Sequence, residues 1–211
     1  MTKAVKIYGE RNSGNIYLEW LLAKNLEVDI LDSPAYGWKH RLAPSDEELT
    51  PEMKSNTVFV CLIKNPYSWL LSMHKRPYNH ESLRKLPFSE FLKYSFGDYR
   101  NPIIMWNQKI KSYLDLKNYV PQYILFKYED LLEDFKVELN RFADQFGLEK
   151  PELYKNINNL LTHSHGIKSA GFHRDFYIEE RWKQSLRGKH IDFINEHLDQ
   201  SLMNQLNYSI L

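Results

Sequence analysis

The chain has a single cysteine, Cys61, among its 211 residues. One cysteine can form neither an intrachain disulfide nor a multi-cysteine zinc site, so the fold depends on neither. A chain of this length buries enough apolar surface to fold without such cross-links. The low cysteine content indicates a reducing compartment, and we expect a cytoplasmic protein.

The sequence also lacks an excess of charge of either sign and any long apolar run. Its 28 Lys and Arg and 27 Asp and Glu leave a net charge of +1 at pH 7. A protein that neutralises many phosphates needs a basic surface, so we expect no nucleic acid as a partner. No apolar stretch approaches the roughly 18–20 residues that span a bilayer, and the first residues lack the apolar core of a signal peptide. We expect one domain over residues 1–211 and no membrane span.

Short apolar runs alternate with helical periodicity along the chain. The run TVFVCLI at residues 57–63 is typical of a strand that is buried on both faces of a parallel sheet. Further strands are predicted at residues 4–8, 28–31 and 123–126, and helices at residues 14–22, 65–74, 101–113, 132–146, 151–161, 175–186 and 190–206. This alternation predicts an α/β fold: a three-layer, P-loop-like domain with a central, mostly parallel sheet flanked by helices. The polar residues 33–56 are expected to form a long loop.

Residues 9–15 (GERNSGN) have the G-x4-G skeleton of a phosphate-binding loop between a predicted strand and a predicted helix. Glycines let backbone amides approach an anion, and the helix N-terminus adds unpaired N–H groups. Asn15 and Ile16 stand where an ATP-binding loop has Lys and then Ser or Thr. The loop therefore predicts anion binding but disfavours an ordinary ATPase or GTPase. A tight turn without a ligand is the alternative.

A second polar pair follows the central strand. Lys64 ends that strand, and Ser72 lies two helical turns into the next predicted helix. Ligands of parallel sheets bind at the carboxyl ends of the strands, so a cation and a hydroxyl that converge there suit a second phosphate. The alternative roles are a solvated lysine and a small packing serine.

Together, these segments resemble the paired nucleotide motifs of PAPS-dependent sulfotransferases. The family's first motif, approximately P-K-S-G-T-T-W-L, is similar to R-N-S-G-N-I-Y-L at residues 11–18. Its second motif, R-N-P followed by Ser, is similar to K-N-P at residues 64–66 with Ser72. The Y-E-D-L run at residues 128–131 and the segment at residues 194–208 resemble the turn before a long helix and the terminal helix of the family. The G-E-R-N-S-G form is closest to a small bacterial branch.

This resemblance implies an enzyme that moves a sulfuryl group from PAPS to a hydroxyl or amine of a small-molecule, glycan or lipid-linked acceptor by in-line transfer, with no metal required. The expected catalytic residues are Arg11, His74 and Glu10, with His80 as the second histidine. The expected nucleotide-binding residues are Arg11, Asn12, Ser13, Gly14, Asn15, Ile16, Lys64, Ser72, Arg174 and Tyr177. The alternatives are a P-loop nucleotide kinase or NTPase and a degenerate nucleotide-binding protein without turnover.

The chain departs from the family pattern at several positions. Asn12 replaces the lysine that bridges the transferring group, and Lys64 replaces an arginine, which keeps the charge but loses the bidentate fork. The late R-K-G element has a loose counterpart at residues 187–189, with Arg174, Arg181 and Lys183 as competing candidates. The histidines at 163, 165 and 173 lack a nearby carboxylate or cysteine to complete a tetrahedral set, so no metal is expected.

The acceptor is expected to contact residues 33–56, 76–100 and 162–174. These segments carry many aromatic residues, which suit stacking against sugar or aromatic rings and suit ordinary packing equally well: Tyr36, Trp38, Tyr78, Tyr94 and Tyr99.

Overall fold

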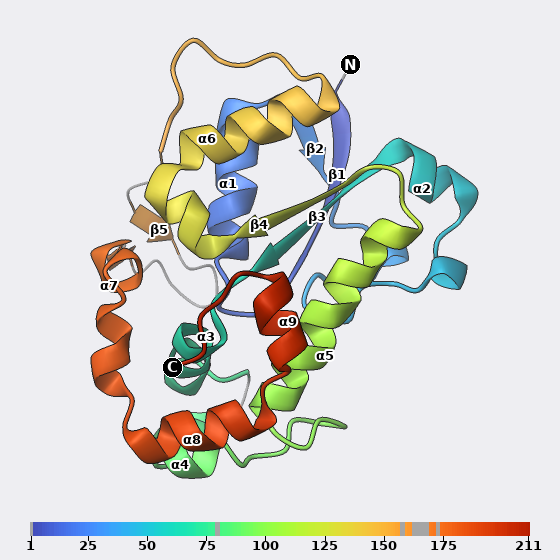
Figure 1. The fold of residues 1–211 in the computed structure, drawn as a ribbon. Coiled ribbons are helices and arrows are strands. Elements are labelled where there is room, and N and C mark those ends of the chain that lie inside the picture. Colours follow the sequence, from blue (N-terminus) through green and yellow to red (C-terminus); the bar gives the residue numbers. More distant parts are fainter. Residues whose placement is uncertain (1, 79–80, 157–158, 162–168, 172–173) are drawn as a thin grey trace.

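The computed structural model describes residues 2–78, 81–156, 159–161, 169–171 and 174–211. At its centre lies a parallel sheet with the strand order β2-β1-β3-β4 (Figure 1). The strands are β1 (Lys3–Gly9), β2 (Val28–Ile30), β3 (Thr57–Ile63) and β4 (Tyr123–Lys127). Helices cover both faces, so the predicted three-layer α/β fold is confirmed.

Strand β3 lies between β1 and β4 and is buried along its whole length, as its apolar run predicts. In the register of the sheet, Gly9 pairs with Leu62, and Ile63 pairs with Lys127. The carboxyl ends of β1, β3 and β4 therefore meet at one edge, where the loop after Gly9 and the turn after Ile63 lie next to each other.

Two hydrophobic clusters form the core, one on each face of the sheet. Helices α1 (Asn15–Asn25) and α6 (Tyr128–Phe146) pack on one face. Helices α3 (Pro66–Lys75), α5 (Pro102–Asp115), α8 (Gly188–His197) and α9 (Gln200–Gln205) pack on the other, together with the short α4 (Phe88–Phe91). The connection from β1 therefore leads into one layer of helices, and the connection from β3 leads into the other.

The predicted helix starts are explained by local capping. The side chain of Asn65 accepts a hydrogen bond from the N–H of Tyr67 at 3.0 Å, and that of Asn101 accepts one from Ile104 at 2.9 Å. A proline at the first helical position follows each cap. Helix α6 begins at Tyr128, one turn before the predicted start, and ends at Gly147 with φ +65°.

Other boundaries differ from the prediction. Residues 33–56 contain the short α2 (Pro51–Asn56) and two 3-10 turns. The helix predicted over residues 175–186 is α7 (Arg174–Ile178) followed by a 3-10 turn, and the helix predicted over residues 190–206 is divided into α8 and α9. None of the described helices is long and apolar enough to cross a bilayer.

The helix predicted over residues 151–161 is wrong. Instead, β5 (Asn159–Leu161) pairs antiparallel with β6 (Ser169–Gly171). Before β5, Tyr154 donates a hydrogen bond to Asn140 at 2.6 Å, and the N–H of Lys155 donates one to Asn25, also at 2.6 Å. These contacts with α6 and α1 hold the backbone in a non-helical path, which local periodicity does not reveal.

Candidate anion-binding site

Side chains donate hydrogen bonds to the carbonyl groups of the loop between β1 and α1 and fix its conformation. The side-chain amide of Asn15 donates to the carbonyls of Gly9 (3.1 Å) and Glu10 (2.9 Å). The Trp69 indole N–H donates to the carbonyl of Arg11 at 2.8 Å. Asn12 adopts a left-handed conformation with φ +66°, which asparagine tolerates better than most residues.

With its carbonyls engaged, the loop presents backbone donors. Among the described residues, no acceptor pairs with the backbone N–H groups of Asn12, Gly14, Asn15 and Ile16. Ser13 is buried, and its N–H donates back to the carbonyl of Glu10 at 3.1 Å. Unpaired N–H groups at the start of an eleven-residue helix are an arrangement that suits an anion.

The second glycine of the loop is required by both conformation and space. Gly14 has φ +96°, and a Cβ at this position would lie 2.4 Å from the ring of Tyr128, the first residue of the Y-E-D-L run. The two motifs are therefore in direct contact across the sheet edge.

We expect Gly14→Ala to lower the free energy of unfolding by about 1–3 kcal/mol, because it adds a ring clash to a strained backbone. Urea denaturation measures this change. Gly97→Ala is the matched control, since Gly97 also has positive φ (+57°) but a Cβ there would meet no atom within 4 Å. An equal loss in the two variants would contradict the role given to the Tyr128 contact.

Lys64 and Ser72 meet next to this loop. The Lys64 ammonium donates to Ser72 Oγ at 2.9 Å and to the carbonyl of Asn12 at 3.4 Å. Lys64 is only 1% exposed, and burial lowers its pKa, against the opposing effects of Tyr177 and Glu129. The structure thus places Lys64 and Ser72 next to the loop between β1 and α1.

The backbone that carries Lys64 is fixed from both sides. The Trp106 indole N–H donates to the Lys64 carbonyl at 3.1 Å. Glu129, in the Y-E-D-L run, accepts the N–H of Asn65 at 3.0 Å and the hydroxyl of Tyr208 at 2.9 Å. The Y-E-D-L run and the C-terminal segment therefore both brace the turn after β3.

Tyr177 covers the Lys64 ammonium. Its ring centroid lies 4.0 Å from Lys64 Nζ, and its hydroxyl lies 3.3 Å from Ser72 Oγ. Burial by itself would raise the pKa of Tyr177, but Lys64 and the hydrogen bond with Ser72 outweigh it and lower that pKa. Arg174, also predicted in this site, donates instead to the carbonyls of Leu132 (2.7 Å) and Glu133 (3.1 Å) on α6.

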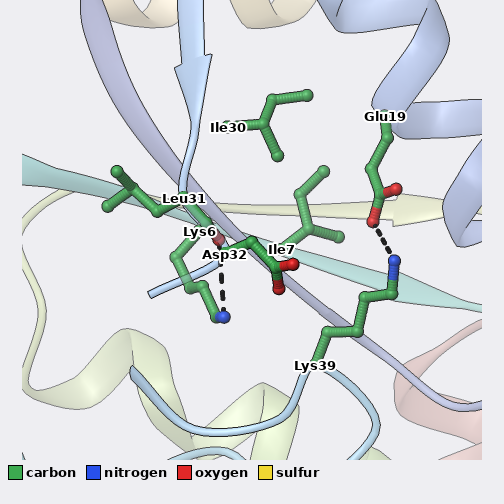
Figure 2. A pocket seen from close by; sticks show the side chains of 7 residues that line it. All are labelled: Lys6, Ile7, Glu19, Ile30, Leu31, Asp32 and Lys39. Carbon is green, nitrogen blue, oxygen red and sulfur yellow. Dashed lines mark hydrogen bonds and ion pairs between the residues drawn. The ribbon is translucent and has the colours of Figure 1, made fainter. Parts of the chain in front are cut away.

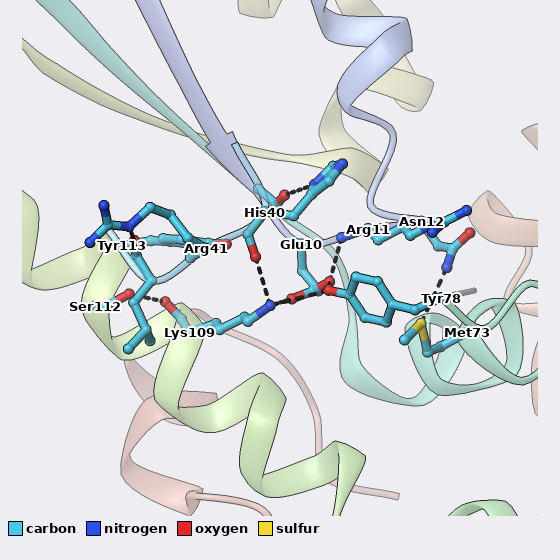
Figure 3. Close-up of polar contacts among 12 residues, drawn as sticks. Glu10, Arg11, Asn12, His40, Arg41, Met73, Tyr78, Lys109, Ser112 and Tyr113 are labelled. Carbon is cyan, nitrogen blue, oxygen red and sulfur yellow. Dashed lines mark hydrogen bonds and ion pairs between the residues drawn. The ribbon is translucent and has the colours of Figure 1, made fainter. Parts of the chain in front are cut away.

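A second polar cluster lies at the start of the loop (Figure 3). Glu10 is fully buried and forms an ion pair with Lys109 of α5. Its carboxylate also accepts the hydroxyl of Tyr78 and, at 2.6 Å, the N–H of Arg11. Lys109 in turn donates to the carbonyl of His40 at 2.7 Å. Three donors therefore bind the Glu10 carboxylate, and this arrangement fixes the start of the loop to α5.

His40 lies alongside Gly9 in this cluster. Its Nδ1 is 2.6 Å from the Gly9 carbonyl, so Nδ1 carries the proton and Nε2 carries the lone pair. Within the part of the chain that the structure describes, nothing hydrogen-bonds Nε2. Burial, together with the charges of Lys39, Lys109 and Arg11, lowers the pKa of His40 to about 4 despite the hydrogen bond to Gly9. His40 is therefore neutral at pH 7, and its Nε2 is unprotonated.

The other predicted residues have different surroundings. His74 Nε2 lies 2.8 Å from the carbonyl of Leu86, and its ring packs against Phe88 and Phe91. These contacts favour a packing role, although the catalytic prediction for His74 stays untested. The Asn12 side chain donates to the carbonyl of Arg76 at 3.1 Å. His80 lies outside the described residues, as do the histidines at 163, 165 and 173.

Arg11 is the cation of the loop. Its guanidinium lies 5.5 Å from the centroid of the Tyr78 ring, and none of the described side chains forms an ion pair with it. Nor does the described part of the chain contain a group of three His, Cys, Asp or Glu residues that could hold a metal ion.

The segment that carries His40 is held beside the sheet by Lys6 of β1. Its ammonium donates to the carbonyls of Gly37 (3.0 Å) and Leu31 (3.5 Å). Lys6 borders a small hollow with Asp32 and with an ion pair between Lys39 and Glu19 (Figure 2). Because β2 ends at Ile30, this segment replaces it as the neighbour of Gly9, whose N–H donates to the Lys39 carbonyl at 3.0 Å.

Neither His40 nor Lys109 was predicted from the sequence. Lys109 carries a weak signal, because a charged residue interrupts the apolar face formed by Trp106, Ile110 and Tyr113. His40 carries none beyond its position in the polar segment at residues 33–56.

Comparisons with known proteins bear on the fold. No protein-family model and no curated protein matches the chain. A sulfotransferase from Alicyclobacillus acidocaldarius is similar in structure, with a TM-score of 0.52 and 12% sequence identity over 99% of this chain and 97% of that one. The chain therefore has the fold of that sulfotransferase over almost its full length.

Two further structures are similar over a smaller part of their length. Mouse sulfotransferase SULT7A1 complexed with PAP has a TM-score of 0.48 and 17% identity, covering 71% of this chain and 60% of that one. The sulfotransferase domain from the curacin biosynthetic pathway has a TM-score of 0.45 and 15% identity, covering 87% of this chain and 63% of that one. This chain spans less than two thirds of either protein.

Proposed function

We propose that the protein is a PAPS-dependent sulfotransferase. The observation that carries the proposal is the cradle of unpaired backbone N–H groups in the loop after β1, with the Lys64 ammonium 3.4 Å from a carbonyl of that same loop. One edge of the sheet thus offers two adjacent sites for anionic groups. A nucleotide with phosphate groups on both its 5′ and 3′ sides suits this pair. The fold shared with the Alicyclobacillus sulfotransferase supports the same function.

The donor groups of the site fit PAPS without a lysine in the loop. The N–H groups of Asn12, Gly14, Asn15 and Ile16 would hold the 5′-phosphosulfate at the positive end of the α1 dipole. Arg11 would neutralise charge on the transferring sulfuryl group, which the family's loop lysine does elsewhere. Lys64 and Ser72 would hold the 3′-phosphate and select PAPS over ATP.

Sulfuryl transfer resembles phosphoryl transfer in its demands. The acceptor oxygen attacks in line while charge spreads over the equatorial oxygens, so catalysis consists of positioning and of donors aimed at those oxygens. His40 Nε2, next to Gly9 at the start of the loop, is the base that this structure favours for the acceptor proton. It replaces Glu10, whose carboxylate is engaged by Lys109 and Tyr78, and His74, whose ring packs against Phe88 and Phe91.

Calorimetric titration tests this function. Adenosine 3′,5′-bisphosphate is expected to bind with micromolar affinity, independently of magnesium, whereas magnesium-ATP binds at least ten-fold more weakly. Magnesium-dependent ATP binding without bisphosphate binding would favour a kinase or NTPase. Tight bisphosphate binding without transfer from PAPS to any acceptor would favour a binding protein without turnover.

Tyr177 and a 3′-phosphate would compete for Lys64 and Ser72. We therefore expect Tyr177→Ala to raise the affinity for adenosine 3′,5′-bisphosphate about five-fold, because removal of one hydrogen bond and one cation–π contact frees roughly 1 kcal/mol. Calorimetry measures the change, with Phe176→Ala on the same helix as the control. A lower affinity would mean that Tyr177 contributes directly to the nucleotide site, as expected from the sequence.

A further inference from the structure

The turn that carries Lys64 is held through a single peptide group. The Lys64 carbonyl accepts the indole N–H of Trp106, on α5, at 3.1 Å. The next N–H along the chain, that of Asn65, donates to the Glu129 carboxylate of α6 at 3.0 Å. This carbonyl and this N–H belong to the same peptide group, so side chains from two helices fix its plane. The path of the backbone at Lys64 is thereby fixed as well.

Glu129 is in turn held by the segment after α9. Its second carboxylate oxygen accepts the Tyr208 hydroxyl at 2.9 Å. Burial raises the pKa of Glu129, whereas its hydrogen bonds and the charge of Lys64 act in the opposite direction. A carboxylate whose two oxygens are both bonded has little freedom to reorient. Tyr208, Glu129 and the Asn65 amide therefore form a continuous chain of hydrogen bonds that ends next to Lys64.

The end of α9 directs Tyr208 toward the start of α6. Asn207 follows the helix with φ +53°, a left-handed conformation that asparagine tolerates and that commonly terminates helices. The N–H of Tyr208 donates back to the carbonyl of Met203 at 3.0 Å, as in a Schellman motif. The chain then runs to α3, where the N–H of Leu211 donates to the Tyr67 hydroxyl at 3.2 Å (Figure 1). A local signal thus places the Tyr208 hydroxyl at the edge of the sheet.

We propose that Glu129 and Tyr208 are positioning residues that set the preference of the site for nucleotides with a 3′-phosphate. They act through the peptide group that orients Lys64, whose ammonium lies 2.9 Å from Ser72 Oγ. The inference rests on the proposed function, which assigns the 3′-phosphate to Lys64 and Ser72. The 5′-phosphate would bind the loop after β1, which side chains of α1 and α3 fix instead. Loss of the chain of hydrogen bonds should therefore weaken binding of the 3′-phosphate alone.

Calorimetric titration with adenosine 3′,5′-bisphosphate and with adenosine 5′-monophosphate separates this role from a purely structural one. Glu129→Leu removes the acceptor of the Asn65 N–H and is expected to lower bisphosphate affinity about 10-fold, with monophosphate affinity within about two-fold of the wild type. Tyr208→Phe removes only the hydroxyl and should show the same selectivity with a loss of about 3-fold. Glu129→Gln keeps an acceptor for the N–H, so bisphosphate affinity should stay within about two-fold of the wild type. Tyr154→Phe, which removes a hydroxyl bonded to Asn140 on the same helix, is the matched control.

The outcomes separate the inference from the function on which it rests. Equal losses for the two ligands, or unchanged bisphosphate affinity in the folded variants, would overturn the positioning role. If Glu129→Leu does not fold, Tyr208→Phe still decides between these outcomes, because it removes a single oxygen. A wild type that binds no bisphosphate overturns the proposed function and the inference with it. Hydrogen exchange of the Asn65 amide then still decides whether Glu129 holds the turn, because Glu129→Leu should accelerate it at least about 10-fold.

Discussion

Lys64→Met is expected to lower the affinity for adenosine 3′,5′-bisphosphate at least about 10-fold while leaving the free energy of unfolding unchanged or higher. The loss of affinity follows because a hydrogen bond to a charged group contributes about 1.5–3 kcal/mol, which corresponds to roughly 10- to 150-fold in binding. The gain in stability follows because the ammonium is buried at 1% exposure and desolvation lowers its pKa. Methionine has a similar length and carries no charge to desolvate.

The same substitution has a defined pH signature. Because the pKa of Lys64 in the folded protein lies below its ordinary value of 10.5, the unfolded chain takes up the proton first as the pH falls below 10.5. The wild type therefore loses stability relative to Lys64→Met as the pH decreases from 10.5 to the lower pKa that Lys64 has in the folded protein. Urea denaturation at several pH values measures the difference.

Two controls separate charge from packing at this position. Lys64→Arg restores the charge and the residue type of the family motif, so it should keep most of the nucleotide affinity. Lys136→Met removes an exposed lysine on α6 and should change neither quantity. Wild-type affinity in Lys64→Met would remove Lys64 from the nucleotide site.

His40→Asn is expected to lower kcat for transfer from PAPS to a hydroxyl acceptor by about 10²- to 10³-fold, a typical loss on removal of a general base. Asparagine keeps a donor near the position of Nδ1, so the contact with the Gly9 carbonyl persists and bisphosphate affinity should stay within about two-fold. Steady-state kinetics with calorimetry on the same preparations separate these two effects.

His74→Gln is the matched control, since glutamine places a donor near the position of Nε2 and can still bind the carbonyl of Leu86. We expect it to retain most of the wild-type kcat. Loss of transfer in His74→Gln with normal activity in His40→Asn would reverse the assignment and restore the base expected from the sequence.

The pH dependence of catalysis and stability should share one origin at His40. With a pKa of about 4 instead of 6.5, His40 stays neutral until the pH falls well below neutrality, so kcat/KM should be flat from about pH 5 to 8 and fall as the pH decreases through about 4. His40 contributes stability that is fully present above pH 6.5 and is lost as the pH falls through about 4. His40→Asn should remove this acid-side component.

The parts of the site that are local in sequence were predicted correctly in position. The apolar run of β3, the glycine pair after β1 and the Asn-Pro starts of α3 and α5 each encode their own geometry within a few residues. Parallel pairing then places the loop and Lys64 at one edge of the sheet. The roles assigned to these residues stay predictions until the binding experiments are made.

The parts that depend on distant segments were not predicted. The carboxylate of Glu10 meets Lys109, which lies 99 residues away, and a one-dimensional pattern does not encode such a pair. His40 reaches Gly9 only because β2 is short and the following segment takes its place along β1. The helix expected over residues 151–161 is absent because contacts with α1 and α6 outweigh local helical periodicity.

By itself, the sequence determined the α/β fold, the position of the glycine loop after β1 and the arrival of a cation beside it. It could do so because strand periodicity, glycine conformation and helix capping are short-range effects. Only the tertiary structure decided which titratable groups are free to act. The availability of a nitrogen or a carboxylate depends on the donors, acceptors and rings that other elements bring to it. The packing of these elements buries Lys64 under Tyr177 and pairs Glu10 with Lys109. The same packing leaves His40 Nε2 without a hydrogen bond among the described residues.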